Sequence, residues 1–196
     1  MFALRSFCRY VLIVIGLFSM QAEVFGYALM PYRWDKQAVP IFFRFDPGVY
    51  NASFYAAMKK WNVISSGVQL QNGSHNLPQS AVGIRCGEGG NSASFSYSVC
   101  GKVWGERVLA ITLVSEVGGI AMHGDILFNP SVPYALYNGP VRGESRDFGR
   151  VALHELGHFL GLNHETSAPS IMRPIVGDFE NLFEDDKKGV NARYPN

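Results

Sequence analysis

The chain has 196 residues, enough for one well-buried domain, and its 17 basic and 16 acidic side chains give a net charge of +1. This near balance, without a basic run, argues against nucleic-acid binding and against a polybasic membrane anchor. We therefore expect no nucleic-acid partner.

The N-terminal segment has the layout of a secretory signal peptide. Basic Arg5 and Arg9 precede an apolar run at 10–20. These eleven residues are too few to cross a bilayer of about 30 Å, and no second stretch of spanning length follows. We expect residues 1–26 to be removed, with a cut after Ala28 as the alternative, and no stable membrane span to remain.

The remaining chain, 27–196, has no internal repeat or linker, so we expect a single exported domain, secreted or periplasmic and monomeric. Cys8 lies in the signal region, which leaves Cys86 and Cys100. In an oxidising compartment we expect these two to form a disulfide bond, and two separately buried thiols are the alternative.

The first half of this domain combines short apolar runs with one helical segment. Apolar residues at helical spacing predict a helix at 51–64 that packs against a sheet, with Ser53 as its N-cap. The segment 87–101 is rich in glycine, serine and asparagine and predicts a surface loop held by the disulfide. Strands are predicted at 40–45, 67–70 and 81–85.

The second half begins with two predicted neighbouring strands, at 107–115 and 119–129. A helix is predicted at 147–160, with Asp147 near its start, where the helix dipole favours a negative charge. A final helix is predicted at about 183–193.

The most informative stretch reads HELGHFLGLNHE and begins at His154. His154 and His158 are four residues apart, so they share a helix face and can share one metal ion. Glu155 lies beside them, where its carboxylate can reach a water bound to that ion. Gly161 can end the helix in the left-handed conformation, so that the chain turns back and His164 completes a three-histidine set. Three protein ligands leave a position open for water, as a catalytic zinc site requires.

A second segment supports this interpretation. SIMRP at 170–174 places Met172 eight residues after His164, in an expected tight turn. Together the two segments resemble the metzincin metalloproteases, whose zinc signature is followed by a Met-turn. Within the metzincins the chain resembles the matrixins, the family of the matrix metalloproteases and their compact bacterial relatives, because both segments match, including Pro174. The matrixin C-terminal helix is matched by Leu182, Asp185, Asp186, Gly189, Val190 and Tyr194.

Two features depart from the usual matrixin pattern. Glu165 follows the third histidine, as in astacins, where vertebrate matrixins usually place serine. No cysteine lies between Cys8 and Cys86, so we expect no cysteine-switch propeptide. The enzyme would then be active once it is folded and metal-bound, or be restrained by a separate inhibitor.

The resemblance implies an α+β metzincin fold, a twisted mixed β-sheet with two long helices, a zinc helix, a Met-turn and a C-terminal helix. It also implies a secreted zinc endopeptidase acting on proteins or peptides. His154, His158 and His164 would bind one catalytic Zn²⁺, Glu155 would be the general base, and Met172 would form a hydrophobic floor. A catalytically silent zinc-containing binding or adhesion protein is the alternative.

Other side chains are secondary metal candidates. His75 and His123 could form a second metal site, as loop histidines do in some matrixins, and single exposed histidines are the alternative. Calcium, which many matrixins carry, is a further candidate, although no dense oxygen-ligand loop is visible. The candidate calcium ligands are Asp125, Asp178, Asp185 and Asp186. By the resemblance, Asp185 and Asp186 could instead support the zinc helix or pair with the mature N-terminus.

Overall fold

The computed structural model describes residues 26–35, 37–45, 48–73 and 90–195. Four features of the sequence lie outside these residues: most of the expected signal peptide, His75, the predicted strand at 81–85, and Cys86. The disulfide bond between Cys86 and Cys100 therefore stays a prediction.

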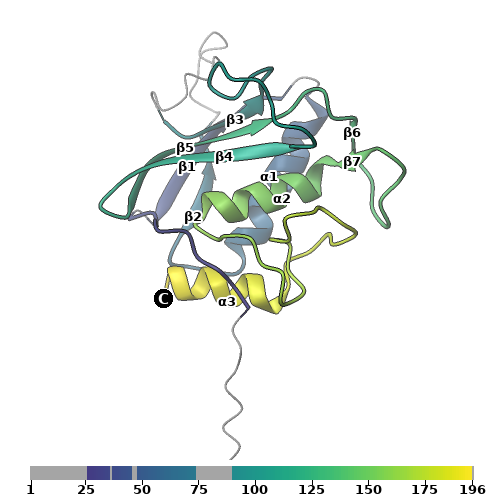
Figure 1. Cartoon of the computed structure of the whole chain (residues 1–196). Helices are drawn as coiled ribbons and strands as arrows, with labels where there is room; N and C mark the ends of the chain where they lie inside the picture. Colours follow the sequence, from purple (N-terminus) through teal and green to yellow (C-terminus); the bar gives the residue numbers. More distant parts are fainter. Residues whose placement is uncertain (1–25, 36, 46–47, 74–89, 196) are drawn as a thin grey trace, which may run out of the picture.

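The described residues form a five-stranded sheet, a small two-stranded sheet and three helices (Figure 1). The strand order in the large sheet is β2-β1-β3-β5-β4. Only the β4–β5 pair is antiparallel, so the sheet is mixed and the predicted α+β fold is confirmed. The elements are β1 (Ala38–Phe43), α1 (Val49–Asn62), β2 (Gln69–Asn72), β3 (Ser92–Phe95), β4 (Ala110–Val117), β5 (Ile120–Phe128), β6 (Tyr134–Ala135), β7 (Arg146–Asp147), α2 (Phe148–Phe159) and α3 (Glu184–Arg193).

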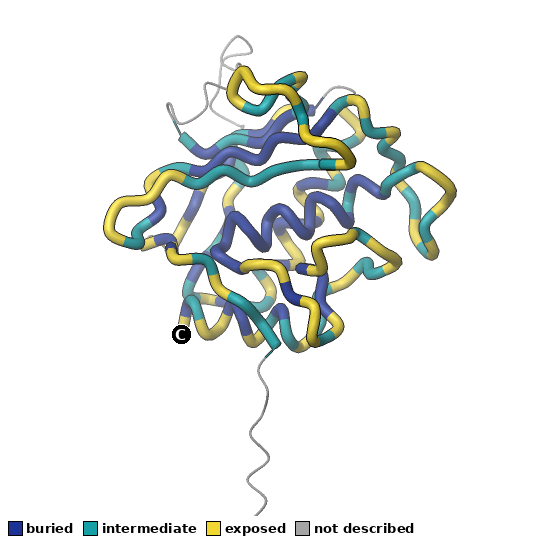
Figure 2. Tube along the Cα trace, in the orientation of Figure 1, coloured by how far each residue is buried: buried dark blue, intermediate teal, exposed yellow. Residues whose placement is uncertain are grey.

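The core lies where α1 and α2 pack against each other and against the sheet. The indole nitrogen of Trp61 on α1 donates to the carbonyl oxygen of Leu153 on α2, at 2.9 Å. In the same core, the rings of Phe45, Phe128 and Phe148 pack with centroids 4.7 to 5.4 Å apart. Helix α2 is buried along almost its whole length (Figure 2). Its side chains are therefore held by packing on several sides.

One prediction from the sequence is wrong, because β3 lies inside the segment 87–101 that we expected to be a surface loop. The strand is central, with β1 on one side and β5 on the other. Its small residues Ala93 and Ser94 are 1% and 6% exposed. Serine and alanine have low β-propensity, so the strand depends on pairing with its neighbours rather than on its own sequence.

The N-cap expected at Ser53 is also wrong, because α1 begins earlier, with Gly48 at its N-cap and no side-chain hydrogen bond there. The residue that links the helix to β1 is Asn51, whose Oδ1 accepts from the backbone N–H of Phe45 at 2.9 Å. Nothing in residues 49–52 prevents helix formation, so the helix starts before the serine.

The other predicted elements within the described residues are present, with ends shifted by up to three residues. Such shifts are usual for element boundaries. Of the helices in the part of the chain that the structure describes, none has the length and apolar character needed to cross a membrane.

Candidate active site

Helix α2 begins and ends with well-formed caps. The Asp147 side chain accepts from the backbone N–H of Arg150 at 2.9 Å, as an N-cap does. At the other end Gly161 has φ +87°, and the N–H groups of Gly161 and Leu162 donate back to His158 and Gly157 at 2.8 and 2.9 Å. This pair of bonds is a Schellman motif, and it turns the chain back along the helix.

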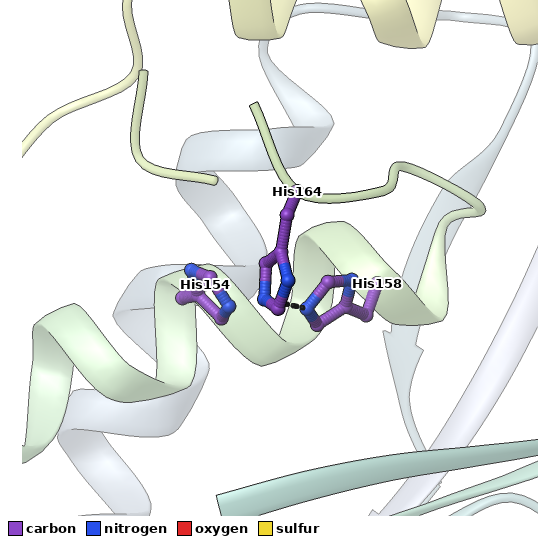
Figure 3. A group of neighbouring side chains, drawn as sticks. All are labelled: His154, His158 and His164. Atoms are coloured by element: carbon purple, nitrogen blue, oxygen red, sulfur yellow. Dashed lines mark hydrogen bonds between the residues drawn. The ribbon is translucent and has the colours of Figure 1, made fainter. Parts of the chain in front are cut away.

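The turn brings the three histidines together (Figure 3). One ligand atom from each of His154, His158 and His164 lies within 4.8 Å of the others. The ring centroids are 4.7 to 5.3 Å apart, and the two Nε2 atoms of His158 and His164 are 3.1 Å apart. Within the described residues this is the one group of three or more metal-competent side chains.

Two of the rings are oriented by backbone carbonyl groups. His154 Nδ1 lies 2.8 Å from the carbonyl oxygen of Ile171, and His158 Nδ1 lies 2.9 Å from that of Leu162. A carbonyl oxygen only accepts, so both rings carry their proton on Nδ1 and present an unprotonated Nε2 to the cluster. Burial lowers the pKa of His154 to about 3 and that of His158 to about 4. Both are thus neutral near pH 7, as metal ligands must be, and the residues present fit a zinc ion.

Glu155 lies beside the edge strand β4 of the sheet. Its side chain is buried, and the Thr112 hydroxyl on β4 donates to its Oε2 at 2.6 Å. Burial raises the pKa of Glu155 to about 7, and the hydrogen bond from Thr112 acts in the opposite direction. A carboxyl group with a pKa near the working pH can both accept and release a proton.

Met172 lies beneath the helix that carries the histidines, and it is 2% exposed. A Cβ atom added at Gly157 would overlap the Met172 sulfur atom and lie 3.0 Å from the Trp61 ring. Glycine at position 157 therefore allows the close contact between α2 and the Met-turn. Gly157 was not singled out from the sequence. A signal was present, because a glycine inside a helix costs about 1 kcal/mol relative to alanine and therefore calls for a structural reason.

Asp186 on α3 connects the C-terminal helix to the Met-turn. The carboxylate is 1% exposed and accepts from the Ser170 hydroxyl at 2.5 Å and from the backbone N–H of Ile171 at 3.1 Å. The Ser170 oxygen in turn accepts from the backbone N–H of Met172 at 2.8 Å. Because the carbonyl of Ile171 orients His154, this network reaches the histidine cluster.

The segment 26–35 packs against the C-terminal end of α2. The Tyr32 hydroxyl donates to the carbonyl oxygen of His158 at 2.6 Å, and the Trp34 indole donates to that of Phe159 at 2.7 Å. Tyr194, from the other end of the chain, donates to the carbonyl of Leu160 at 3.0 Å. The bonds from Trp34 and Tyr194 satisfy carbonyl groups that the end of a helix leaves without partners, and Tyr32 adds a second donor to a carbonyl that already accepts from Gly161.

A cavity of about 190 Å³ lies beside the Met-turn. It is lined by Ile171, by residues of the following loop from Arg173 to Phe179, and by Arg150. The Arg150 guanidinium is buried and bonds to the Gly177 carbonyl at 3.2 Å and to Glu180 at 3.1 Å. Arg150 also lines a second cavity, of about 370 Å³, so its side chain forms part of the wall between the two.

The secondary metal candidates are spread over the fold. Asp125 on β5 accepts from the Ser92 hydroxyl at 2.5 Å, and Asp178 accepts from the backbone N–H of Val141 at 2.7 Å. Asp185 lies on α3 beside Gly26. Among the described residues neither these aspartates nor His123 join a group of three possible ligands, so calcium and a second metal remain untested expectations.

The fold and the histidine cluster are those of a metzincin-type metal-dependent hydrolase, and comparison with known proteins identifies the family. The family model described as Matrixin matches residues 47–195, about three quarters of the chain. The chain therefore belongs to the matrixin family, as its motifs predicted.

Several matrix metalloproteinases are similar to part of the chain. Human matrix metalloproteinase-25 is 44% identical over 62 residues, which is 29% of this chain and 11% of that protein. Human matrix metalloproteinase-15 is 35% identical over 81 residues, 39% of this chain and 12% of that protein. Interstitial collagenase from Sus scrofa is 46% identical over 54 residues, 25% of this chain and 11% of that protein. The chain thus spans only about an eighth or less of the length of these relatives.

Proposed function

We propose that this chain is a zinc-dependent endopeptidase. The observation that carries the proposal is the convergence of three histidine ligand atoms within 4.8 Å, next to a buried glutamate. Membership in the matrixin family supports the same activity.

In this proposal each residue of the site has a separate task. His154, His158 and His164 hold the ion through one ring nitrogen each, and backbone carbonyls orient the first two rings. A zinc ion there would polarise the substrate carbonyl and lower the pKa of a bound water to about 7. Glu155 accepts a proton from the attacking water and delivers it to the departing amine nitrogen. Met172 supports the histidines from below without binding the metal.

The proposed substrate is an extended polypeptide that lies along β4. This strand is at the edge of the described sheet, and its residue Thr112 contacts Glu155. Edge strands offer unpaired backbone groups to a peptide, which can add as a further strand. The 190 Å³ cavity is below the roughly 300–1,000 Å³ of sites for whole small ligands, so it suits one side chain of the peptide. Ile171, Ile175 and Phe179 in its lining favour an apolar one.

We propose further that the domain is released from a signal peptide and acts outside the cytoplasm. A cut after Gly26 would create a new ammonium group at Tyr27. The Asp185 carboxylate already accepts from the backbone N–H groups of Gly26 and Tyr27, and its Oδ2 is buried without a partner. The new charge would supply that partner. N-terminal sequencing of the exported protein tests this proposal, since a start at Tyr27 is expected and a start beyond Ala28 would contradict it.

A peptidase assay separates the enzyme from the silent binding protein. Purified protein is incubated with a fluorogenic peptide library, with zinc or with a chelator, and its zinc content is measured. Turnover that depends on zinc supports the endopeptidase. Stoichiometric zinc without cleavage of any peptide would instead support a binding or adhesion protein on the same scaffold.

A further inference from the structure

Thr112 lies in the first half of β4, and its hydroxyl contacts Glu155. The hydroxyl oxygen is 2.6 Å from Oε2 of Glu155 and 3.1 Å from the backbone carbonyl oxygen of the same residue. A hydroxyl group has one proton to donate, and 2.6 Å falls in the range of charge-assisted O–H···O⁻ bonds. Thr112 therefore donates mainly to the carboxylate.

The carboxylate needs such a partner because the terminal side-chain torsion of glutamate does not by itself fix the positions of the two oxygens. The terminal torsion of glutamate is broad and roughly two-fold, so rotation readily moves or exchanges the two oxygens. Among the described residues, Thr112 is the one side chain that donates to this carboxylate. Its hydroxyl engages Oε2 and leaves Oε1 without a protein donor.

Thr112 itself is held rigidly. It pairs with Ile126, which is fully buried in β5, and a β-branched side chain has few χ1 rotamers available. The register shift in the β4–β5 pair falls between Ser115 and Glu116, beyond Thr112. The donor is thus fixed by the sheet and the acceptor by α2.

We propose that Thr112 is a positioning residue for Glu155, whose hydroxyl holds Oε2 so that Oε1 stays directed at the attacking water. The inference rests on the proposed endopeptidase function. It also couples two parts of the site, because the strand that would pair with the substrate is the strand that orients the general base. A peptide aligned along β4 is thereby aligned with Glu155.

Two variants of Thr112 and one control test the role of the hydroxyl. Thr112→Val keeps the shape and removes the hydroxyl, Thr112→Ser keeps the hydroxyl, and Ser115→Ala removes an exposed hydroxyl from the same strand. The zinc-loaded valine variant should lose roughly 10–100-fold in kcat, as is typical when a residue supporting a metal site is removed. Its KM should stay within about twofold, because the substrate contacts are unchanged. The serine variant should recover most of the lost kcat, and the control should match the wild type.

A double-mutant cycle on stability provides a readout that does not depend on turnover. The denaturation midpoint of the zinc-loaded protein is measured for Thr112→Val, for Glu155→Ala and for the double variant. If the hydroxyl acts through Glu155, the valine substitution lowers the midpoint in the wild type and leaves it unchanged when residue 155 is alanine. A loss of the same size in both backgrounds would show a packing role and overturn the proposal.

The two proposals fail in different ways. If wild-type protein binds zinc and cleaves no peptide, the endopeptidase proposal fails, while the cycle still measures the contact between Thr112 and Glu155. If wild-type protein is active and Thr112→Val keeps its kcat, the positioning role is wrong. It is also wrong if Thr112→Ser is as slow as Thr112→Val.

Discussion

The two ends of α2 are held by different kinds of contact. At the C-terminal end, consecutive carbonyl groups of the last turn accept hydrogen bonds from Tyr32, Trp34 and Tyr194. At the N-terminal end, the side chain of Arg150 bonds to Glu180 and to loop carbonyls. The histidines lie toward the first end, and the smaller cavity lies beside the second.

This difference matches what each end has to do. Backbone carbonyls are fixed by the helix itself, so bonds to them can hold His158 and the following turn with little freedom. The Arg150 guanidinium bonds to a loop rather than to the helix backbone, so the pocket that it lines depends on how that loop packs. We therefore expect the metal site to be rigid and the side-chain pocket to be the part that substitutions change more easily.

The largest effect is expected at the middle of the helix, from Glu155→Gln. The amide cannot accept and release the proton, so peptide cleavage should fall roughly 10²–10⁴-fold while zinc stays bound. Steady-state kinetics and metal analysis check this result, with the exposed Glu184→Gln as the control. Activity close to that of the wild type would remove Glu155 from the mechanism.

The C-terminal end is tested by Gly161→Ala, paired with Gly118→Ala. Both glycines have positive φ, but only at Gly161 would a Cβ atom meet a backbone atom, the Tyr32 carbonyl oxygen, at 2.7 Å. The first variant should lose about 2–4 kcal/mol of unfolding free energy, together with zinc affinity, and the second about 1 kcal/mol. Chemical denaturation and competition with a chelator measure both quantities. Equal losses would mean that the turn after α2 is not especially constrained.

The N-terminal end is tested by Arg150→Leu, with Arg142→Leu as a control on the exposed surface. The shorter leucine side chain should enlarge the pocket where Arg150 separates the two cavities. We expect kcat/KM for a long apolar substrate side chain to rise relative to a short one, by roughly tenfold or more. Stability should also fall, because Glu180 loses its charged partner. A pair of peptides that differ at this one side chain provides the measurement, and an unchanged preference would show that Arg150 does not limit the pocket.

The smallest effect is expected for a change of one pH unit, measured as the unfolding free energy of the metal-free protein. The pKa values of His154 and His158 are lowered from 6.5 to about 3 and 4, so below pH 6.5 the unfolded chain binds protons that the folded chain does not. Each histidine should therefore lower the unfolding free energy by up to about 1.4 kcal/mol per pH unit as the pH falls toward 4. Glu155 acts oppositely, because its pKa is raised to about 7 and the folded state takes up the proton first.

The glutamine variant separates these opposing contributions. In metal-free Glu155→Gln the carboxyl group no longer opposes the destabilising effect of the two histidines. The unfolding free energy should therefore fall more steeply between pH 6.5 and 4.5 than in the wild type. Denaturation curves at several pH values measure the two slopes. Parallel slopes would show that Glu155 does not titrate differently in the folded and unfolded states.

Most of the helical structure was predictable from the sequence, and part of the sheet was not. Helix α2 and its end at Gly161 follow from residues only a few positions apart, and the structure has both. The central strand β3 was missed because three of its four residues are serine or alanine, which do not predict a strand, and because its neighbours order it. The sequence also did not predict the role of Gly157, because that role depends on contacts with Met172 and Trp61, which lie far from it in the chain.

By itself the sequence determined the family, the order of the main elements, and the residues that we propose to bind a metal and transfer a proton. These depend on helical spacing and on the left-handed freedom of one glycine, which are properties of a short stretch of chain. Tertiary structure decided which groups hold those residues in place, such as Tyr32 at the carbonyl of His158 and Thr112 at the carboxylate of Glu155. Such contacts join residues up to 126 positions apart, and their pairing is set by how the elements pack in three dimensions.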